Sequence, residues 1–521
     1  MGSWWRTARR PSPLSAEVSR ERLAASVAEL ARRPKHAGTA EELESLRWVE
    51  QELQSYGYAT ELLRHDAYIS LPAAARVEAD GEPVSCITHS FSRPTPPEGI
   101  EGRFPVVDGL AMPGTLIPGA TVQIHVSPHE HLHEMCISPV WGSPDDIEVE
   151  RLPAATVVTV PASAGDRVRA ASRVRVFAEV DTGWRPTPIL IAERAEPDEP
   201  FVLFSGHHDA WYIGAMDNGG ANATMLEVAR VCALRRSEWR RGLRLAFWSG
   251  HSQGRYSSSA WYSDHHWEEL EARAVAHVNV DSTGGRGNVL VDEATASAEL
   301  RALAREAIAA EAGQQFRGLR MLRAGDQSFW GIGVPSIFGN MGQQPPEERI
   351  AFGTGWWWHT PDDTLDKIDP DVLVRDTRIY LHVVSRLLTE RVPPLDFAET
   401  GRDLVRVLEE RDGAVALSRC VERARALVER ADRFAVTQHV DATRAAECLR
   451  RVSRAVVPID YTTGDRFGHD PALGQPALPS LDDPGRLADP RFAGTRLVRA
   501  ANRVAVSLRE AVAAFDEYAA T

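Results

Sequence analysis

The fold is decided by residues 201–209, which read Phe-Val-Leu-Phe-Ser-Gly-His-His-Asp. The short apolar run predicts a buried strand, and polar side chains follow where that strand ends. The run Leu243–Trp248 leads in the same way into Ser249–Ser252, and Ala274–Val280 leads into Asp281. Because reactive groups gather at the carboxyl ends of the strands in an open parallel sheet, we expect these segments to meet at one edge.

Helical patterns alternate with these strands. We expect helices at Thr224–Leu234, Ser297–Ala312 and Pro370–Leu388, and a further strand at Val289–Val291. Such alternation predicts the fold class α/β, with a mainly parallel mixed sheet flanked by helices.

Two other regions differ from this α/β part. Residues 67–185 contain short β-branched runs, such as Thr121–Val126 and Ala155–Val160, between Pro- and Gly-rich turns, which predicts an inserted β-rich domain. Residues 396–521 have a helical pattern, with helices expected at Leu404–Ala431, Val440–Val457 and Ala493–Tyr518. We therefore predict a catalytic domain from residues 1–66 and 186–395, an inserted domain at 67–185, and a helical domain at 396–521.

Charge and composition exclude several classes of protein. The 521 residues include 59 Lys and Arg against 73 Asp and Glu, a net charge of −14 that argues against a nucleic-acid partner. The 5 cysteines show no CxxC spacing, which argues against a thiolate zinc site or a disulfide framework. No apolar run approaches the roughly 20 residues of a membrane span. We expect a soluble, cytoplasmic protein without a membrane partner.

The polar residues at the strand ends suit a divalent cation. Imidazole and carboxylate groups are typical zinc ligands, and one carboxylate can bridge two ions. His207, Asp217 and Asp281 are predicted to hold one ion, and Asp217 with His359 part of a second. Asp209 follows His207 by two residues and is predicted to accept the other ring N–H of that histidine, which would fix its tautomer.

Several motifs resemble the zinc aminopeptidase and glutamate carboxypeptidase family. The matching segments are Gly206–Trp211, Gly214–Asn218, Leu226–Arg230, Asn279–Ser282, Asp326–Phe329 leading to Gly333–Pro335, and His359–Thr364. Together with the layout of the domains, the resemblance extends over essentially the whole chain. The resemblance implies a site for one or two divalent ions, with zinc favoured, held by His207, Asp217, Asp281 and His359. It also implies a protease-associated character for the inserted domain and a homodimer formed through the C-terminal helices.

The sequence departs from the family after the strand Leu243–Trp248. The family carries two adjacent glutamates there, a general base and a ligand of the second metal, whereas this chain has His251 and Ser252. His251 could supply the missing metal ligand, or it could move a proton, because imidazole titrates near neutrality. A single-metal site is the third possibility.

Three functions follow from this departure. The first is a metal-dependent hydrolase that acts on an amide or peptide-like bond of a small molecule or short peptide, with His251 and Asp209 in catalysis. The second is a metalloenzyme of another type, such as a lyase or a ring-opening or deaminating enzyme. The third is an inactive binding or receptor-like homologue.

Other residues are candidates for substrate contacts. Arg255 and Tyr256 could anchor a carboxylate, Trp358 could form an aromatic wall, and His208 could reach the substrate. A run of four histidines in the inserted domain predicts either an auxiliary metal site, a wall of the substrate cleft, or a solvated loop; it comprises His125, His129, His131 and His133.

Overall fold

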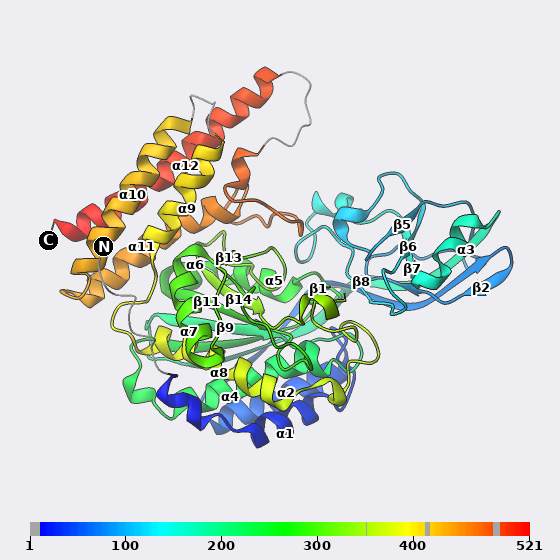
Figure 1. Ribbon diagram of the computed structural model, residues 1–521, viewed down its shortest axis with the longest axis horizontal. Coiled ribbons are helices and arrows are strands. Elements are labelled where there is room, and N and C mark those ends of the chain that lie inside the picture. Colours follow the sequence, from blue (N-terminus) through cyan, green and yellow to red (C-terminus); the bar gives the residue numbers. More distant parts are fainter. Residues whose placement is uncertain (1–10, 351, 412–416, 483–489, 521) are drawn as a thin grey trace.

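A ten-stranded mixed sheet forms the centre of the molecule (Figure 1). The computed structural model describes residues 11–350, 352–411, 417–482 and 490–520. Four neighbouring strands run parallel: β14 (Ser336–Asn340), β11 (Ala274–Asp281), β9 (Phe201–His207) and β10 (Gly242–Trp248). The predicted α/β class and the three strands that lead into His207, Ser249 and Asp281 are therefore confirmed.

The remaining strands extend the sheet on both sides. Next to β10 come β8 (Val174–Arg194), β1 (Ala59–Ala79) and β2 (Glu82–Val84), all antiparallel to their neighbours, while β4 (Ile100–Gly102) pairs with β8. Beyond β14 lie β12 (Thr295–Ala296) and β13 (Leu319–Arg320).

Helices cover both faces of the sheet. One face packs against α1 (Arg20–Leu30), α2 (Ala40–Ser55), α4 (Ala221–Ala233), α7 (Arg301–Ala312) and α8 (Pro370–Thr389). The other face packs against α5 (Ser257–His265) and α6 (Trp267–Arg273). The strands β9, β10 and β11 are buried along nearly their whole length, as expected for parallel strands covered on both sides.

One predicted strand is wrong. Val289–Val291 is irregular, and Leu290 makes only an isolated bridge to Gln343. The place beside β11 is taken by β14, which the sequence analysis did not predict. Val289 is 44% exposed and only Val291 is fully buried, so this apolar run is not buried along its length as the central strands are.

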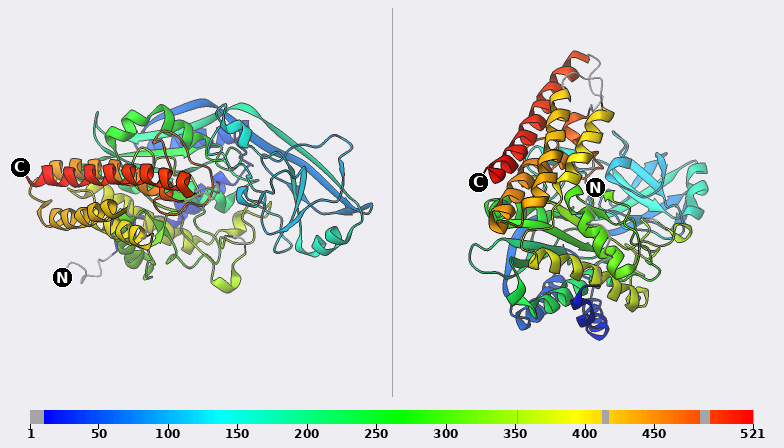
Figure 2. Two further views of the ribbon diagram at one scale, coloured as in Figure 1. Left: turned by 90° about the horizontal axis from the view of Figure 1, so that it is seen from above. Right: turned by 60° about the vertical axis from the view of Figure 1, so that its left-hand side comes forward.

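The predicted inserted region has its own sheet, and its strands β6 (Val122–Val126) and β7 (Thr156–Val160) match the predicted runs. They pair with β5 (Val106–Asp108) and β3 (Ile87–Thr88), and α3 (Gly165–Ala170) lies beside them. The long strands β1 and β8 run from the central sheet into this region, as Figure 2 shows. The predicted domain boundaries at residues 66/67 and 185/186 lie opposite each other within this pair of strands.

In the C-terminal part, the described residues include four α-helices, packed against one another above the sheet in Figure 1. They are α9 (Phe397–Glu410), α10 (Ser418–Thr437), α11 (Ala442–Tyr461) and α12 (Pro490–Ala519). The single helix predicted at Leu404–Ala431 is thus wrong, because α9 ends and α10 begins within that range. Residues 412–416 between them include a glycine, a poor helix former, and lie outside the described residues.

The structure also bears on the cysteines and on membrane-spanning helices. All five cysteines are free thiols. Among the described residues, no helix is long and apolar enough to cross a membrane.

Candidate metal centre

His207 and Asp281 come together because their strands are neighbours. His207 ends β9, opposite Trp248 of β10, and β11 pairs with β9 on the other side, so that Asp281 follows at the same edge. The His207 Nε2 atom lies 3.5 Å from Asp281 Oδ1. Parallel pairing in register therefore delivers the imidazole and the carboxylate to one point.

Asp217 reaches the same point from a tight turn. Its Oδ1 atom lies 3.1 Å from His207 Nε2. Gly214, at φ +57°, begins the turn, and a Cβ atom there would lie 2.3 Å from the Asp217 carbonyl oxygen, so only glycine fits. The carboxylate of Asp363 accepts hydrogen bonds from the backbone N–H groups of Met216 (2.9 Å) and Asp217 (3.0 Å) and so holds the turn in place.

The two facing atoms fit a shared cation. His207 Nε2 and Asp217 Oδ1 are buried, and neither has a hydrogen-bond partner among the described residues, although they face each other. Burial opposes the charged form of His207, but the carboxylates of Asp217 and Asp281 outweigh burial and raise its pKa well above the usual range. The two carboxylates that stabilise the protonated, positively charged form of His207 would also stabilise a divalent cation at this position.

His359 approaches Asp217 from the opposite side. Its Nε2 atom lies 3.2 Å from Asp217 Oδ2, while its Nδ1–H group donates to the backbone carbonyl of Glu134 at 2.7 Å. Glu134 also donates its own N–H to the His359 carbonyl at 3.1 Å. The inserted region thus fixes the tautomer that leaves Nε2 of His359 free for a metal.

Asp209 has the predicted partner but uses a different atom. The Nδ1–H group of His207 donates to the backbone carbonyl of Asp209 at 2.7 Å, whereas the nearest Asp209 carboxylate oxygen is 3.8 Å away. That carboxylate accepts from the backbone N–H groups of His251 (3.1 Å) and Ser252 (2.9 Å). Asp209 therefore orients His207 and also fixes the loop that carries His251 and Ser252.

His251 lies directly over His207. The two rings are stacked, with centroids 3.8 Å apart and planes at 15°. The Nδ1–H group of His251 donates to Asp326 Oδ2 at 2.8 Å, which leaves Nε2 available. Ligand atoms of His207, His251 and Asp281 all lie within 4.8 Å of one another. The geometry is therefore compatible with His251 either as an additional metal ligand or as a group that moves a proton.

A cavity of about 480 Å³ opens beside these groups. Its wall includes Asp217, His251, Asp281 and His359, together with the predicted substrate contacts Arg255, Tyr256 and Trp358. Trp358 stacks on His359 with ring centroids 3.5 Å apart. The guanidinium of Arg255, however, donates to the backbone carbonyls of Cys136 and Ser138, so it mainly anchors the inserted region.

The structure corrects the expectation for His208. Its side chain is completely buried, does not line the cavity, and bonds through Nδ1 to Asn222 Oδ1 at 2.7 Å. Because alternate residues of a strand point to opposite sides, His208 turns away from the edge at which His207 lies.

The histidine run forms a chain of hydrogen bonds. His131 N–H donates to His129 Nδ1 (3.2 Å), the Nε2 atoms of His129 and His133 lie 3.3 Å apart, and His133 Nδ1–H donates to the Trp358 carbonyl. His131 stacks on Trp356, and His125 is separate, bonded to Gln123 and Gly109. Since His133 is buried, the run is not a solvated loop; it supports the segment that carries His359.

The supporting roles of three residues of the site were not predicted from the sequence. Asp326 and Asp363 occur in the family-like motifs, but nothing in their local sequence indicates that they hold His251 and the Asp217 turn. Glu134 acts through its backbone, which no sequence pattern signals. All three contacts join segments far apart in the chain.

Comparison with known proteins agrees with the fold. Residues 189–384 match the sequence model of peptidase family M28. The chain is 37% identical over 95 residues to the probable glutamate carboxypeptidase VP8 of Zea mays, and 32% identical over 96 residues to the aminopeptidase NAALADL1 of Mus musculus. Each alignment spans 18% of this chain and 13% of the relative.

Solved structures of similar fold include the zinc aminopeptidase BSAP of Bacillus subtilis. It has a TM-score of 0.55 at 18% identity, over 72% of this chain and 96% of that one. An aminopeptidase of Aneurinibacillus sp. strain AM-1 gives a TM-score of 0.51 at 18% identity, over 72% and 95%. Residues 189–384 are thus similar to peptidase family M28, and the chain shares its fold with zinc aminopeptidases.

Proposed function

We propose that the protein is a metal-dependent hydrolase that cleaves an amide or peptide bond of a small molecule or short peptide. The observation that carries the proposal is the convergence of four candidate metal ligands at the wall of a cavity: two histidines face the carboxylate of Asp217, and Asp281 faces one of these histidines, His207. The ligands are His207, Asp217, Asp281 and His359, and the favoured ion is zinc. When bound, the ion supplies Lewis acidity to the substrate carbonyl and the attacking water.

His251 is proposed to take the place of the usual glutamate base. Its Nε2 atom accepts a proton from the attacking water and then returns it to the leaving nitrogen. Asp326 accepts the Nδ1–H hydrogen bond throughout, so it fixes the tautomer with a free Nε2 lone pair and stabilises the imidazolium that forms. Asp326 is 1% exposed, and this burial strengthens its interaction with the cation.

The position for a second ion has fewer protein ligands in this chain. Asp217 and His359 offer two ligand atoms for a second ion, and Ser252, in place of the family glutamate, offers only a hydroxyl. Catalytic zinc sites normally have three protein ligands. We therefore propose that the ion at His207, Asp217 and Asp281 binds more tightly than an ion at His359.

The experiment combines metal analysis with turnover of dipeptides and N-acyl amino acids. His251→Ala is expected to keep its zinc and to lose turnover, whereas His439→Ala, which replaces an exposed histidine outside the site, is expected to behave as wild type. Loss of a zinc equivalent in His251→Ala would instead identify a ligand. Zinc-loaded wild-type protein that cleaves none of these substrates would contradict the proposal of hydrolysis.

We further propose that the protein is a homodimer. Apolar side chains on the C-terminal helices support this: Val436 is 79% exposed, Phe492 63% and Val498 50%. Burying such side chains between two chains would remove apolar surface from water. Light scattering coupled to size-exclusion chromatography should give twice the mass of the chain, and a monomer at micromolar concentration would contradict the proposal.

A further inference from the structure

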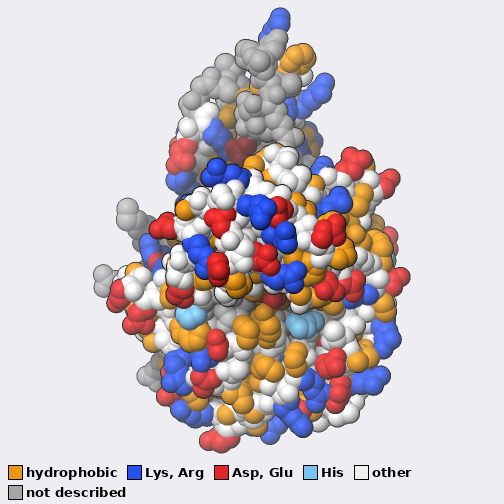
Figure 3. Space-filling view, turned by 90° about the vertical axis from the view of Figure 1, so that its right-hand side faces the viewer, with side chains coloured by type: hydrophobic (Ala, Val, Ile, Leu, Met, Phe, Trp, Pro, Cys, Tyr) orange, Lys and Arg blue, Asp and Glu red, His pale blue; other side chains and the backbone are white. Residues whose placement is uncertain are grey.

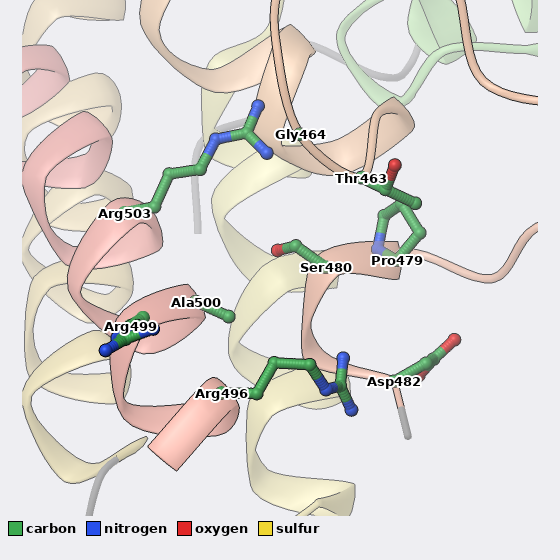
Figure 4. A pocket seen from close by; sticks show the side chains of 9 residues that line it. All are labelled: Thr463, Gly464, Pro479, Ser480, Asp482, Arg496, Arg499, Ala500 and Arg503. Atoms are coloured by element: carbon green, nitrogen blue, oxygen red, sulfur yellow. The ribbon is translucent and has the colours of Figure 1, made fainter. Parts of the chain in front are cut away.

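A second cavity lies in the C-terminal helical part, and we call it the α12 cavity. Its volume is about 460 Å³, and it shares no lining residue with the cavity at the metal centre. Figure 4 shows its wall, which consists of Thr463, Gly464, Pro479, Ser480, Asp482, Arg496, Arg499, Ala500 and Arg503.

Positive charge is concentrated on one wall of this cavity. Arg496, Arg499 and Arg503 lie on α12 at spacings of three and four residues, so they share one face of the helix. The chain as a whole has a net charge of −14, so this wall differs in sign from the average surface. Figure 3 shows the more usual pattern on another face, where acidic and basic side chains are interspersed.

Two polar atoms at the cavity lack partners. The hydroxyl of Ser480, in a residue that is 9% exposed, and the Nη1 atom of Arg503 are buried, and neither makes a hydrogen bond to the described residues. Figure 4 shows the Ser480 hydroxyl directed into the space between its own segment and α12. Buried polar groups are normally satisfied, so these two indicate a missing partner.

The acidic groups near Arg503 leave its Nη1 atom without a hydrogen-bond partner. Asp482 binds Arg411 at 2.6 Å, and Asp470 accepts from the backbone N–H of Thr463 at 2.7 Å. Asp465 and Asp470 also interact electrostatically with Arg503, whose Nη2 atom donates to Thr462 Oγ1 at 3.2 Å. The Nη1 atom of Arg503 and the Ser480 hydroxyl are therefore donors that require an acceptor.

We propose that the α12 cavity binds a phosphate-bearing small molecule. A phosphate group offers several oxygens at once, so it can accept from guanidinium groups and from a hydroxyl in the same site. The volume lies within the range of small-molecule sites, which leaves room for an organic part beyond the phosphate. The phosphate could come from a free anion or from an ester, and these two sources share the recognition by Arg503 and Ser480.

Calorimetric titration of the full-length protein tests this proposal. The probes are inorganic phosphate, pyrophosphate and glycerol phosphate, with citrate as a carboxylate control, at one ionic strength set with chloride. We expect one phosphate site per chain. Tighter binding of glycerol phosphate than of inorganic phosphate would assign an ester, and the reverse would assign the free anion.

Three variants locate the site. Arg503→Met is expected to weaken phosphate binding about tenfold to a hundredfold, the usual effect of losing a hydrogen bond to a charged group, and Ser480→Ala to weaken it less. Arg509→Met removes the same charge from an exposed position of the same helix, outside the cavity, and should leave binding unchanged. Because Arg503→Met could unfold the helical part, Ser480→Ala gives an independent result.

Several results would overturn the proposal. These are no heat of binding from any phosphate probe at millimolar concentration, equal affinity for citrate, or equal weakening by Arg509→Met and Arg503→Met. Unchanged affinity in both Arg503→Met and Ser480→Ala would do the same.

Discussion

Replacement of Asp326 by asparagine tests how His251 acts. The carboxylate of Asp326 accepts the Nδ1–H hydrogen bond of His251 at 2.8 Å, and both residues lie at the metal centre. Asparagine has nearly the same shape but no charge. Its amide nitrogen could also donate to Nδ1, which would move the histidine proton to Nε2 and remove the lone pair that accepts the substrate proton.

The size of the effect follows from the hydrogen bond. An interaction with a charged partner contributes about 1.5–3 kcal/mol, which corresponds to a roughly 10- to 100-fold loss in rate if it stabilises only the imidazolium. Since that imidazolium forms in the chemical step, the loss should fall on kcat, with KM little changed. A switched tautomer would add to the loss.

The assay measures kcat, KM and bound zinc for Asp326→Asn beside a matched control. Asp264→Asn is suitable, because Asp264 pairs with His469 at 2.9 Å on the surface and does not line the cavity at the metal centre. The control should match wild type, while Asp326→Asn should lose kcat and keep its zinc. Unchanged kcat would refute the reasoning, and so would a loss of zinc in proportion to the loss of activity.

Three further predictions concern the supports of the site and one group outside it. Asp363→Ala removes the acceptor of two backbone N–H groups at the Asp217 turn, so zinc affinity should fall at least about tenfold in a calorimetric titration, whereas unchanged affinity would show that the turn holds itself. His133→Leu removes a hydrogen bond to the Trp358 carbonyl next to His359, and it should weaken the second zinc equivalent more than the first; equal weakening would contradict this. Burial raises the pKa of Glu299 from 4.5 to about 7, so the folded state keeps a proton that the unfolded state has lost, and stability decreases as the pH rises through this range. Glu299→Gln should therefore stabilise the protein at pH 8 by up to about 3 kcal/mol relative to its effect at pH 4, measured by denaturant unfolding, and the same difference at both pH values would contradict the assignment.

Most of the fold could be predicted from local sequence patterns. Buried runs such as Phe201–Phe204 and Leu243–Trp248 mark parallel strands because the sheet is covered on both faces, and His207 and Asp281 follow their ends. Val289–Val291 shows the limit of this pattern: a short apolar run of strand length lies in a loop, while β14 occupies the sheet. Whether a short apolar run joins the sheet depends on its pairing with distant segments. The local pattern of a single sequence does not reveal that pairing.

The candidate site was predictable in its ligands but not in its supports. His207, Asp217 and His359 stand in recognisable motifs, and the structure brings their side chains together. The acceptor at His207 Nδ1 is a backbone carbonyl where a carboxylate was predicted, because the chain turns back directly after the strand. His208, the residue after His207, points the other way, and only the register of the strand determines which of the two faces Asp217.

Binding of a divalent cation at Asp217 is the property on which the proposed function depends. Zinc titration by calorimetry into chelator-treated protein tests it most directly, with wild type beside Asp217→Asn and with Asp362→Asn as control for an exposed carboxylate. The account predicts at least one tightly bound zinc per chain in wild type and in Asp362→Asn, and none in Asp217→Asn, because both candidate sites share the lost carboxylate. Equal zinc binding by Asp217→Asn and wild type, or no zinc binding by wild type, would contradict it.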